Sequence, residues 1–172
     1  LRDGARHEIR LRVRTEFHLP DRTSVRATIN NQVECRMIRW PIVDQEKGRI
    51  VFEAAGRIWS SNISDEANAP RPLTDRDLHA TQPSLSPDGR WVALIGSMAG
   101  DVGEHVYRTP AHGGGIQRLT SAPADYARPM WSPDGSRLVV LSGDPRSGGI
   151  GQRRITPRQI AWMASDGGPL HP

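Results

Sequence analysis

The chain has 172 residues, of which 36% are hydrophobic and 24% charged, and its formal net charge is +4 at pH 7. No stretch approaches the roughly 20 consecutive apolar residues that a membrane-spanning helix needs, so we expect no membrane span. The 17 glycines and 14 prolines favour many turns over long helices.

The basic excess is confined to the start of the chain. Residues 1–40 hold nine arginines and five acidic residues, whereas residues 41–172 hold 14 basic and 14 acidic residues. The early arginines alternate with apolar and acidic side chains, which is typical of a solvated strand face rather than of a surface that binds phosphates. We therefore expect no nucleic-acid partner.

Residues 1–38 are predicted to form an N-terminal strand-rich segment. Residues 9–14 alternate apolar and basic side chains, as in a half-exposed strand, and a second strand is predicted at 33–38. The single cysteine, Cys35, cannot form an intramolecular disulfide and is expected to be a small buried hydrophobe. Because the chain starts at Leu1 and ends at Pro172 within a motif, we expect a fragment of a longer protein, truncated at both ends.

Residues 39–172 contain one pattern three times. The stretch "PMWSPDGSR" at 129–137 matches "PSLSPDGRW" at 83–91, and "PIVDQEKGR" at 41–49 is a degraded copy whose glycine comes one residue later. The glycines of the three copies, Gly48, Gly89 and Gly135, are 41 and 46 residues apart. Periods of about 20–50 residues are the mark of repeat architectures.

Each copy continues in the same order, with an apolar run, a strand-like piece bearing an aromatic residue, a polar or glycine-rich turn and a short exit segment. The apolar runs lie at 50–52, 91–95 and 138–141, the aromatic pieces at 57–59, 105–107 and 159–162, and the exit segments at 71–74, 117–120 and 169–170. Runs without strict alternation indicate strands buried on both faces. The sequence thus predicts an all-β fold, a partial β-propeller of about three four-stranded blades at 39–79, 80–125 and 126–172.

The repeated Ser-Pro-Asp-Gly is predicted to be a hairpin turn. Proline presets φ, the aspartate carboxylate accepts nearby backbone N–H groups, and glycine adopts positive φ at low cost. Asp88 and Asp134 are therefore interpreted as turn residues rather than catalytic acids. In the first copy, 44–48, the proline is missing, and we expect a hairpin with a longer, looser loop.

The quoted repeats resemble a known family. "WSPDGSRLVVLSG", "LSPDGRWVALIGS" and "GGGIQRLT" are similar to the WD-like β-propeller repeat of TolB-type proteins. Such propellers occur in the translocation protein TolB, in tricorn and prolyl-oligopeptidase-type peptidases, and in bacterial amidohydrolases. "RMIRWPIVDQEKGRIVFEAAGRIW" at 36–59 and "GEHVYRTPAHGG" at 103–114 resemble the propeller that precedes the metal-dependent barrel of large amidohydrolases.

The resemblance implies a non-catalytic propeller module of a larger amidohydrolase-type hydrolase, periplasmic or secreted, which shapes substrate access or binds a partner. A divalent metal would then belong to a downstream catalytic domain. Two alternatives stay open, namely a TolB-like protein-binding propeller without enzyme activity and the gating propeller of a serine peptidase.

The search for chemistry within the chain gives few candidates. The six histidines show no His-x-His or His-Glu-x-x-His spacing, and there is no Gly-x-Ser-x-Gly elbow, so we expect no catalytic, metal-binding or cofactor-binding residue here. Loops that feed the innermost strands, at 75–82 and 121–128, hold the candidate binding residues His79, Tyr126 and Arg128. For Tyr126 the alternative is simple packing between blades.

Overall fold

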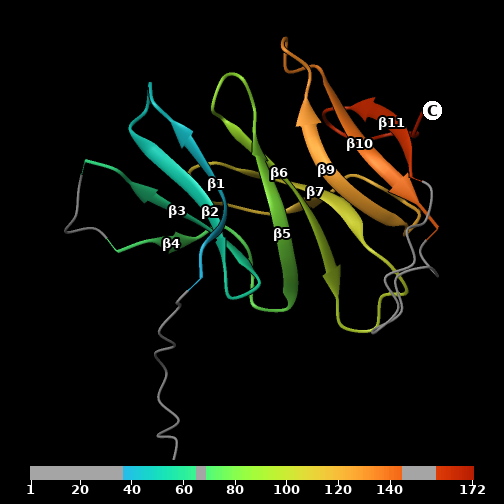
Figure 1. Cartoon of the computed structure of the whole chain (residues 1–172), viewed down its shortest axis with the longest axis horizontal. Helices are drawn as coiled ribbons and strands as arrows, with labels where there is room; N and C mark the ends of the chain where they lie inside the picture. Colours follow the sequence, from blue (N-terminus) through green and yellow to red (C-terminus); the bar gives the residue numbers. More distant parts are fainter. Residues whose placement is uncertain (1–36, 65–68, 145–157) are drawn as a thin grey trace, which may run out of the picture. The chain divides into compact units, whose positions relative to one another are not determined.

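The computed structural model describes residues 37–64, 69–144 and 158–172, all within one compact unit, Glu34–Pro172 (Figure 1). The strands expected within 1–36, and Cys35, lie outside the described residues. In the described ranges every regular element is a β-strand and every strand pairing is antiparallel. The predicted all-β class is confirmed.

The strands form three consecutive sheets, and in each sheet the strands lie side by side in chain order. The first sheet contains β1 (Arg39–Asp44), β2 (Arg49–Ala54), β3 (Arg57–Asn62) and β4 (Arg71–Pro72). The second contains β5 (Leu78–Leu85), β6 (Trp91–Met98), β7 (His105–Pro110) and β8 (Gln117–Arg118). The third contains β9 (Asp125–Trp131), β10 (Arg137–Gly143) and β11 (Gln159–Ala164). Repeated meanders of this kind make the chain a partial β-propeller.

The third sheet differs from the expected four strands. Its exit segment forms only an isolated bridge, in which Trp162 and His171 exchange two backbone hydrogen bonds of 2.7 and 2.8 Å. Gly167 and Gly168 both have positive φ, and Pro169 has no N–H to donate. This stretch therefore reaches ladder geometry only at its end.

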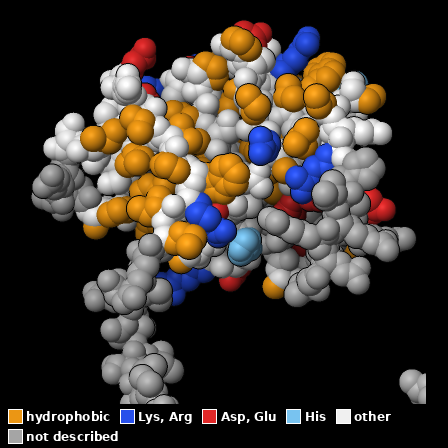
Figure 2. All heavy atoms as spheres, in the orientation of Figure 1, with side chains coloured by type: hydrophobic (Ala, Val, Ile, Leu, Met, Phe, Trp, Pro, Cys, Tyr) orange, Lys and Arg blue, Asp and Glu red, His pale blue; other side chains and the backbone are white. Residues whose placement is uncertain are grey.

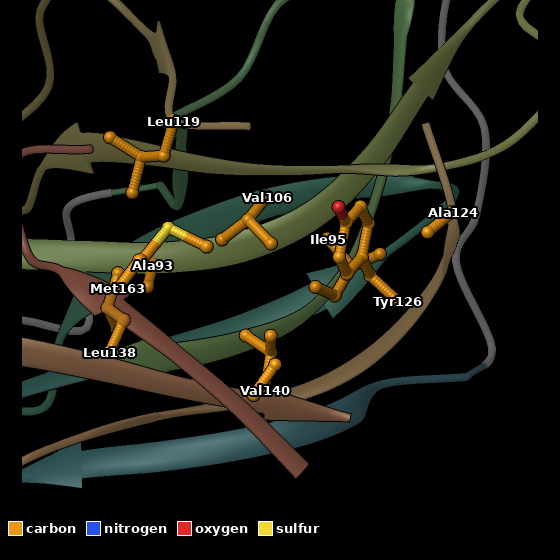
Figure 3. Packing of buried hydrophobic residues seen from close by; sticks show 10 residues of the cluster. Ala93, Ile95, Val106, Leu119, Ala124, Tyr126, Leu138, Val140 and Met163 are labelled. Atoms are coloured by element: carbon orange, nitrogen blue, oxygen red, sulfur yellow. The ribbon is translucent and has the colours of Figure 1, made fainter. Parts of the chain in front are cut away.

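The sheets pack face to face, and the apolar run of β6 shows how. Val92 and Leu94 belong to the core shared with the first sheet, whereas Ala93 and Ile95 belong to the core shared with the third (Figure 3). All four side chains are 0% exposed. Burial on both faces explains why the run is continuous rather than alternating, as predicted.

Both Ser-Pro-Asp-Gly segments are hairpin turns. The Asp134 carboxylate accepts hydrogen bonds from Ser132 Oγ (2.5 Å), Ser136 N (3.1 Å) and Ser136 Oγ (2.8 Å), and Gly135 has φ +71°. Asp88 is held in the same way by Ser86 and Arg90. These bonds to the charged form lower the pKa of Asp134 to about 2 and hold that of Asp88 well below its usual range. The carboxylates serve the turn, and the first copy also keeps a hairpin, with Gly48 at φ +59°.

Candidate functional site

The candidate site is the row formed by the first strands of the three sheets, β1, β5 and β9, here called the inner row. Each is an edge strand of its own sheet, and β5 contacts β1 on one side and β9 on the other (Figure 1). Four hydrophobic side chains in or next to these strands are about half exposed or more, namely Ile38, Trp40, Val43 and Met130. Figure 2 shows hydrophobic side chains gathered over the first sheet, with basic side chains placed singly across this face.

The predicted binding residues lie in strands rather than in loops. β5 already begins at Leu78 and β9 at Asp125, so His79, Tyr126 and Arg128 are part of the ladders. The sequence suggested loops because charged residues and proline crowd these stretches. The structure shows the reason for the earlier start, since Leu78 and Ala80 are buried and pull the strand into the core.

Tyr126 is an interior residue of the core between the second and third sheets. Its side chain is almost fully buried, its hydroxyl donates to Ala122 O (3.1 Å), and burial raises its pKa. This geometry corresponds to the packing alternative considered from the sequence (Figure 3).

His79 and Arg128, by contrast, are exposed on the inner row. The ring of His79 lies over Gly56, so closely that a Cβ there would come within 3.1 Å of it. The backbone N–H of Arg128 donates to Gln82 Oε1 (2.7 Å), which ties β9 to β5. Within the described ranges no acidic group pairs with the Arg128 guanidinium.

Two residues that the sequence reasoning missed are equivalents of Arg128 in the other sheets. Trp40, Gln82 and Arg128 each precede a proline, at 41, 83 and 129, and each has positive φ, between 50° and 52°. At each of them the pairing to the second strand shifts register. The repeated prolines are visible in the sequence, but the residue types before them do not indicate a left-handed conformation.

A buried carboxylate supports this row from behind. Glu53 of β2 is 0% exposed and accepts hydrogen bonds from Arg39 of β1 (2.6 Å) and from the hydroxyl of Thr81 of β5 (2.7 Å). The Arg39 side chain remains 55% exposed. Glu53 thus fixes a partly exposed guanidinium at the junction of the first two sheets. Its only signal in the sequence is one acidic residue within an apolar strand.

A second cluster of charges lies at the ends of the strands opposite the Ser-Pro-Asp-Gly turns. Arg158 donates to both carboxylate oxygens of Asp125, at 3.0 and 2.8 Å. Burial, together with the negative charge of Asp125, raises the pKa of Glu104 to about 7.

A groove of about 540 Å³ separates the two Ser-Pro-Asp-Gly turns. Trp91, Trp131 and Arg108 line it together with the turn residues, and the Arg108 guanidinium lies 4.4 Å from the centre of the Trp91 ring. No group of three or more His, Cys, Asp or Glu side chains in the described ranges is arranged to hold a metal ion. Nor does any helix among these residues have the length and apolar character to span a membrane.

Comparison with known proteins places the fold. No family model matches the chain. The uncharacterized peptidase YuxL of Bacillus subtilis (strain 168) is 38% identical over 69 residues, which are 40% of this chain. The chain spans about 10% of the length of that relative.

Solved structures of β-propeller proteins resemble the chain more widely. A TolB candidate from Agrobacterium tumefaciens matches 83% of this chain and 50% of its own, with a TM-score of 0.63 and 21% identity. The tricorn protease matches 78% of this chain and 13% of its own, with a TM-score of 0.57 and 18% identity. At such identities the likeness shows the fold alone, a TolB-like β-propeller.

Proposed function

We propose that the chain is a non-catalytic β-propeller module of a larger hydrolase, and that it shapes substrate access or binds a partner for that enzyme. The observation that carries the proposal is the inner row, where Arg39, His79 and Arg128 present polar groups. The two acidic residues of its strands, Asp44 and Asp125, form ion pairs with Arg49 and Arg158. Such a surface is suited to recognition rather than to bond cleavage.

For the parent enzyme we favour an amidohydrolase, because "RMIRWPIVDQEKGRIVFEAAGRIW" at 36–59 resembles the propeller region of that group. A metal-dependent barrel would then follow the propeller and supply the metal ligands. Resemblance to TolB-type repeats supports a periplasmic or secreted location for this protein.

A second candidate is the gating propeller of a serine peptidase, and the match to the peptidase-named relative favours it. In that arrangement the propeller gates access to the active site of the peptidase. The third arrangement, a TolB-like binding protein without an enzyme, requires no catalytic domain at all.

The reading frame beyond codon 172 distinguishes the three. A strand ending in His-x-His indicates the amidohydrolase, a Gly-x-Ser-x-Gly elbow the peptidase, and a stop after a few more blades the binding protein. Hydrolase activity of the complete protein, measured on matched peptide and amide substrates, then tests whether the parent protein is a hydrolase and of which kind. A frame without any catalytic domain contradicts the proposal.

A further inference from the structure

The inner row carries backbone strain at three equivalent positions. Trp40, Gln82 and Arg128 have φ values of +52°, +50° and +52°, a region that costs side-chain-bearing residues free energy. Each also precedes a proline, whose ring normally confines the preceding residue to extended conformations. The strain is therefore the same twofold conflict in all three sheets.

A need for the bulge alone does not explain these residue types. Glycine relieves such strain and asparagine lessens it, and the chain uses glycine freely at positive φ elsewhere, for example at Gly89 and Gly135. At these three positions the row has large side chains instead of glycine, namely those of Trp40, Gln82 and Arg128. A β-bulge changes the direction of a side chain, and strain of this kind gathers at functional positions.

The charges of the row select the occupant. Its basic groups are Arg39, His79 and Arg128, and Arg39 is still half exposed although it binds Glu53. The two acids of these strands are already paired, Asp44 with Arg49 at 2.9 Å and Asp125 with Arg158 at 2.8 Å. The strands of the row therefore carry no unpaired carboxylate, and Arg128 offers a guanidinium without an acidic partner among the described residues.

The shape of the donors favours a polypeptide. Gln82 uses its Oε1 to accept from Arg128 N, which leaves its amide N–H groups for a ligand. Trp40 is 47% exposed and adds an apolar platform beside them. Planar guanidinium groups bind carboxylates in a bidentate way, and an indole packs against aliphatic stems.

We propose that Trp40, Gln82 and Arg128 are strained recognition residues, and that the inner row binds an extended acidic polypeptide segment. This inference rests on the proposed recognition role and names its ligand class. It adds that the strained conformations at these three positions lower the stability of the fold but favour binding. A variant that relieves the strain should therefore gain stability and lose affinity for the peptide.

The test uses the complete protein and a fluorescein-labelled hexaglutamate peptide, with hexaglutamine and hexalysine as charge controls. Fluorescence anisotropy should show binding of hexaglutamate only, weakened by salt because exposed charges are screened. Arg128→Gln should weaken binding about tenfold or more at unchanged Tm, since it removes the charge and keeps the strain. Arg128→Gly should weaken binding as much while raising Tm.

The matched control is Arg118→Gln on the outer strand β8, an equal change in net charge that should leave binding unchanged. Several results overturn the inference: no binding of hexaglutamate, equal binding of the neutral peptide, an equal effect of Arg118→Gln, or a lower Tm for Arg128→Gly. Sedimentation equilibrium tests whether a second copy of this chain occupies the row instead. A dimer that dissociates in the Arg128→Gln variant would show that it does, and would overturn the inference. None of these results bears on whether a catalytic domain follows in the reading frame, so the proposed function is tested separately.

Discussion

Arg49 of the first sheet donates hydrogen bonds to Gly89 O (2.5 Å) and Ala111 O (3.1 Å) of the second, and so closes the cleft between the two sheets at their turn ends. Lys47 adds a bond to Asp88 O (2.5 Å). In the second sheet the equivalent position is Trp91, and there the corresponding cleft remains open as the groove of about 540 Å³. The two clefts therefore differ in the residue at this position, arginine in the first and tryptophan in the second.

The buried character of this link gives a first prediction. The Arg49 and Asp44 side chains are only 15% and 9% exposed, so removal of one leaves the other charge largely buried without its ion-pair partner. Arg49→Leu should lower the free energy of unfolding by about 3 kcal/mol. Arg90→Leu is the control, because its ion pair with Asp88 joins side chains that are 76% and 43% exposed, and such pairs contribute about 0–1 kcal/mol. If urea denaturation shows the same loss in free energy of unfolding for both variants, the buried link across the cleft does not stabilise the fold.

The two turn glycines give a second prediction, since their conformations match and their surroundings differ. Gly89 and Gly135 have φ +63° and +71°, so alanine is strained at both and should cost about 1 kcal/mol. A Cβ on Gly135 would meet only Pro87 Cδ at 3.8 Å, whereas on Gly89 it would lie 2.6 Å from Asp44 Oδ2 and 2.7 Å from Lys47 Nζ. Gly89→Ala should therefore lower Tm clearly more than Gly135→Ala. Thermal unfolding that shows equal losses would contradict the contact between the sheets.

Much of the fold could be predicted because each repeat contains the same turn and strand signals in the same order. The turn at 132–135 and the apolar run at 91–95 follow from local rules of φ and burial, and both were located correctly. Other features depend on partners distant in the sequence. The bulge conformation of Arg128 and the burial of Glu53 arise only when neighbouring sheets meet, so no local pattern encodes them. The starts of β5 and β9 were missed for the same reason, because buried residues, not composition, set them.

Acid should weaken the turn at 132–135, which is a third prediction. The pKa of Asp134 falls from its ordinary 3.8 to about 2 on folding, so the unfolded chain binds the proton first. The stabilising contribution is present above pH 3.8 and is lost as the pH falls through about 2. Ser132→Ala removes the main cause of the lowered pKa and should reduce the acid sensitivity of Tm. A Ser121→Ala variant, at an exposed position outside the turn, should keep it; identical pH profiles for both variants would contradict the assignment.

Glu104 should act in the opposite direction, and this is the fourth prediction. Burial and the charge of Asp125 raise its pKa from 4.5 to about 7, so the folded protein holds a proton that the unfolded chain has released. Its contribution is fully present below pH 4.5 and declines as the pH rises to about 7, above which it stays constant. Tm should therefore fall across this range. Glu104→Gln, which is neutral at every pH, should flatten the profile, whereas Glu46→Gln in the exposed turn before β2 should leave it unchanged. A Glu104→Gln protein that keeps the full decline would show that another group releases the proton.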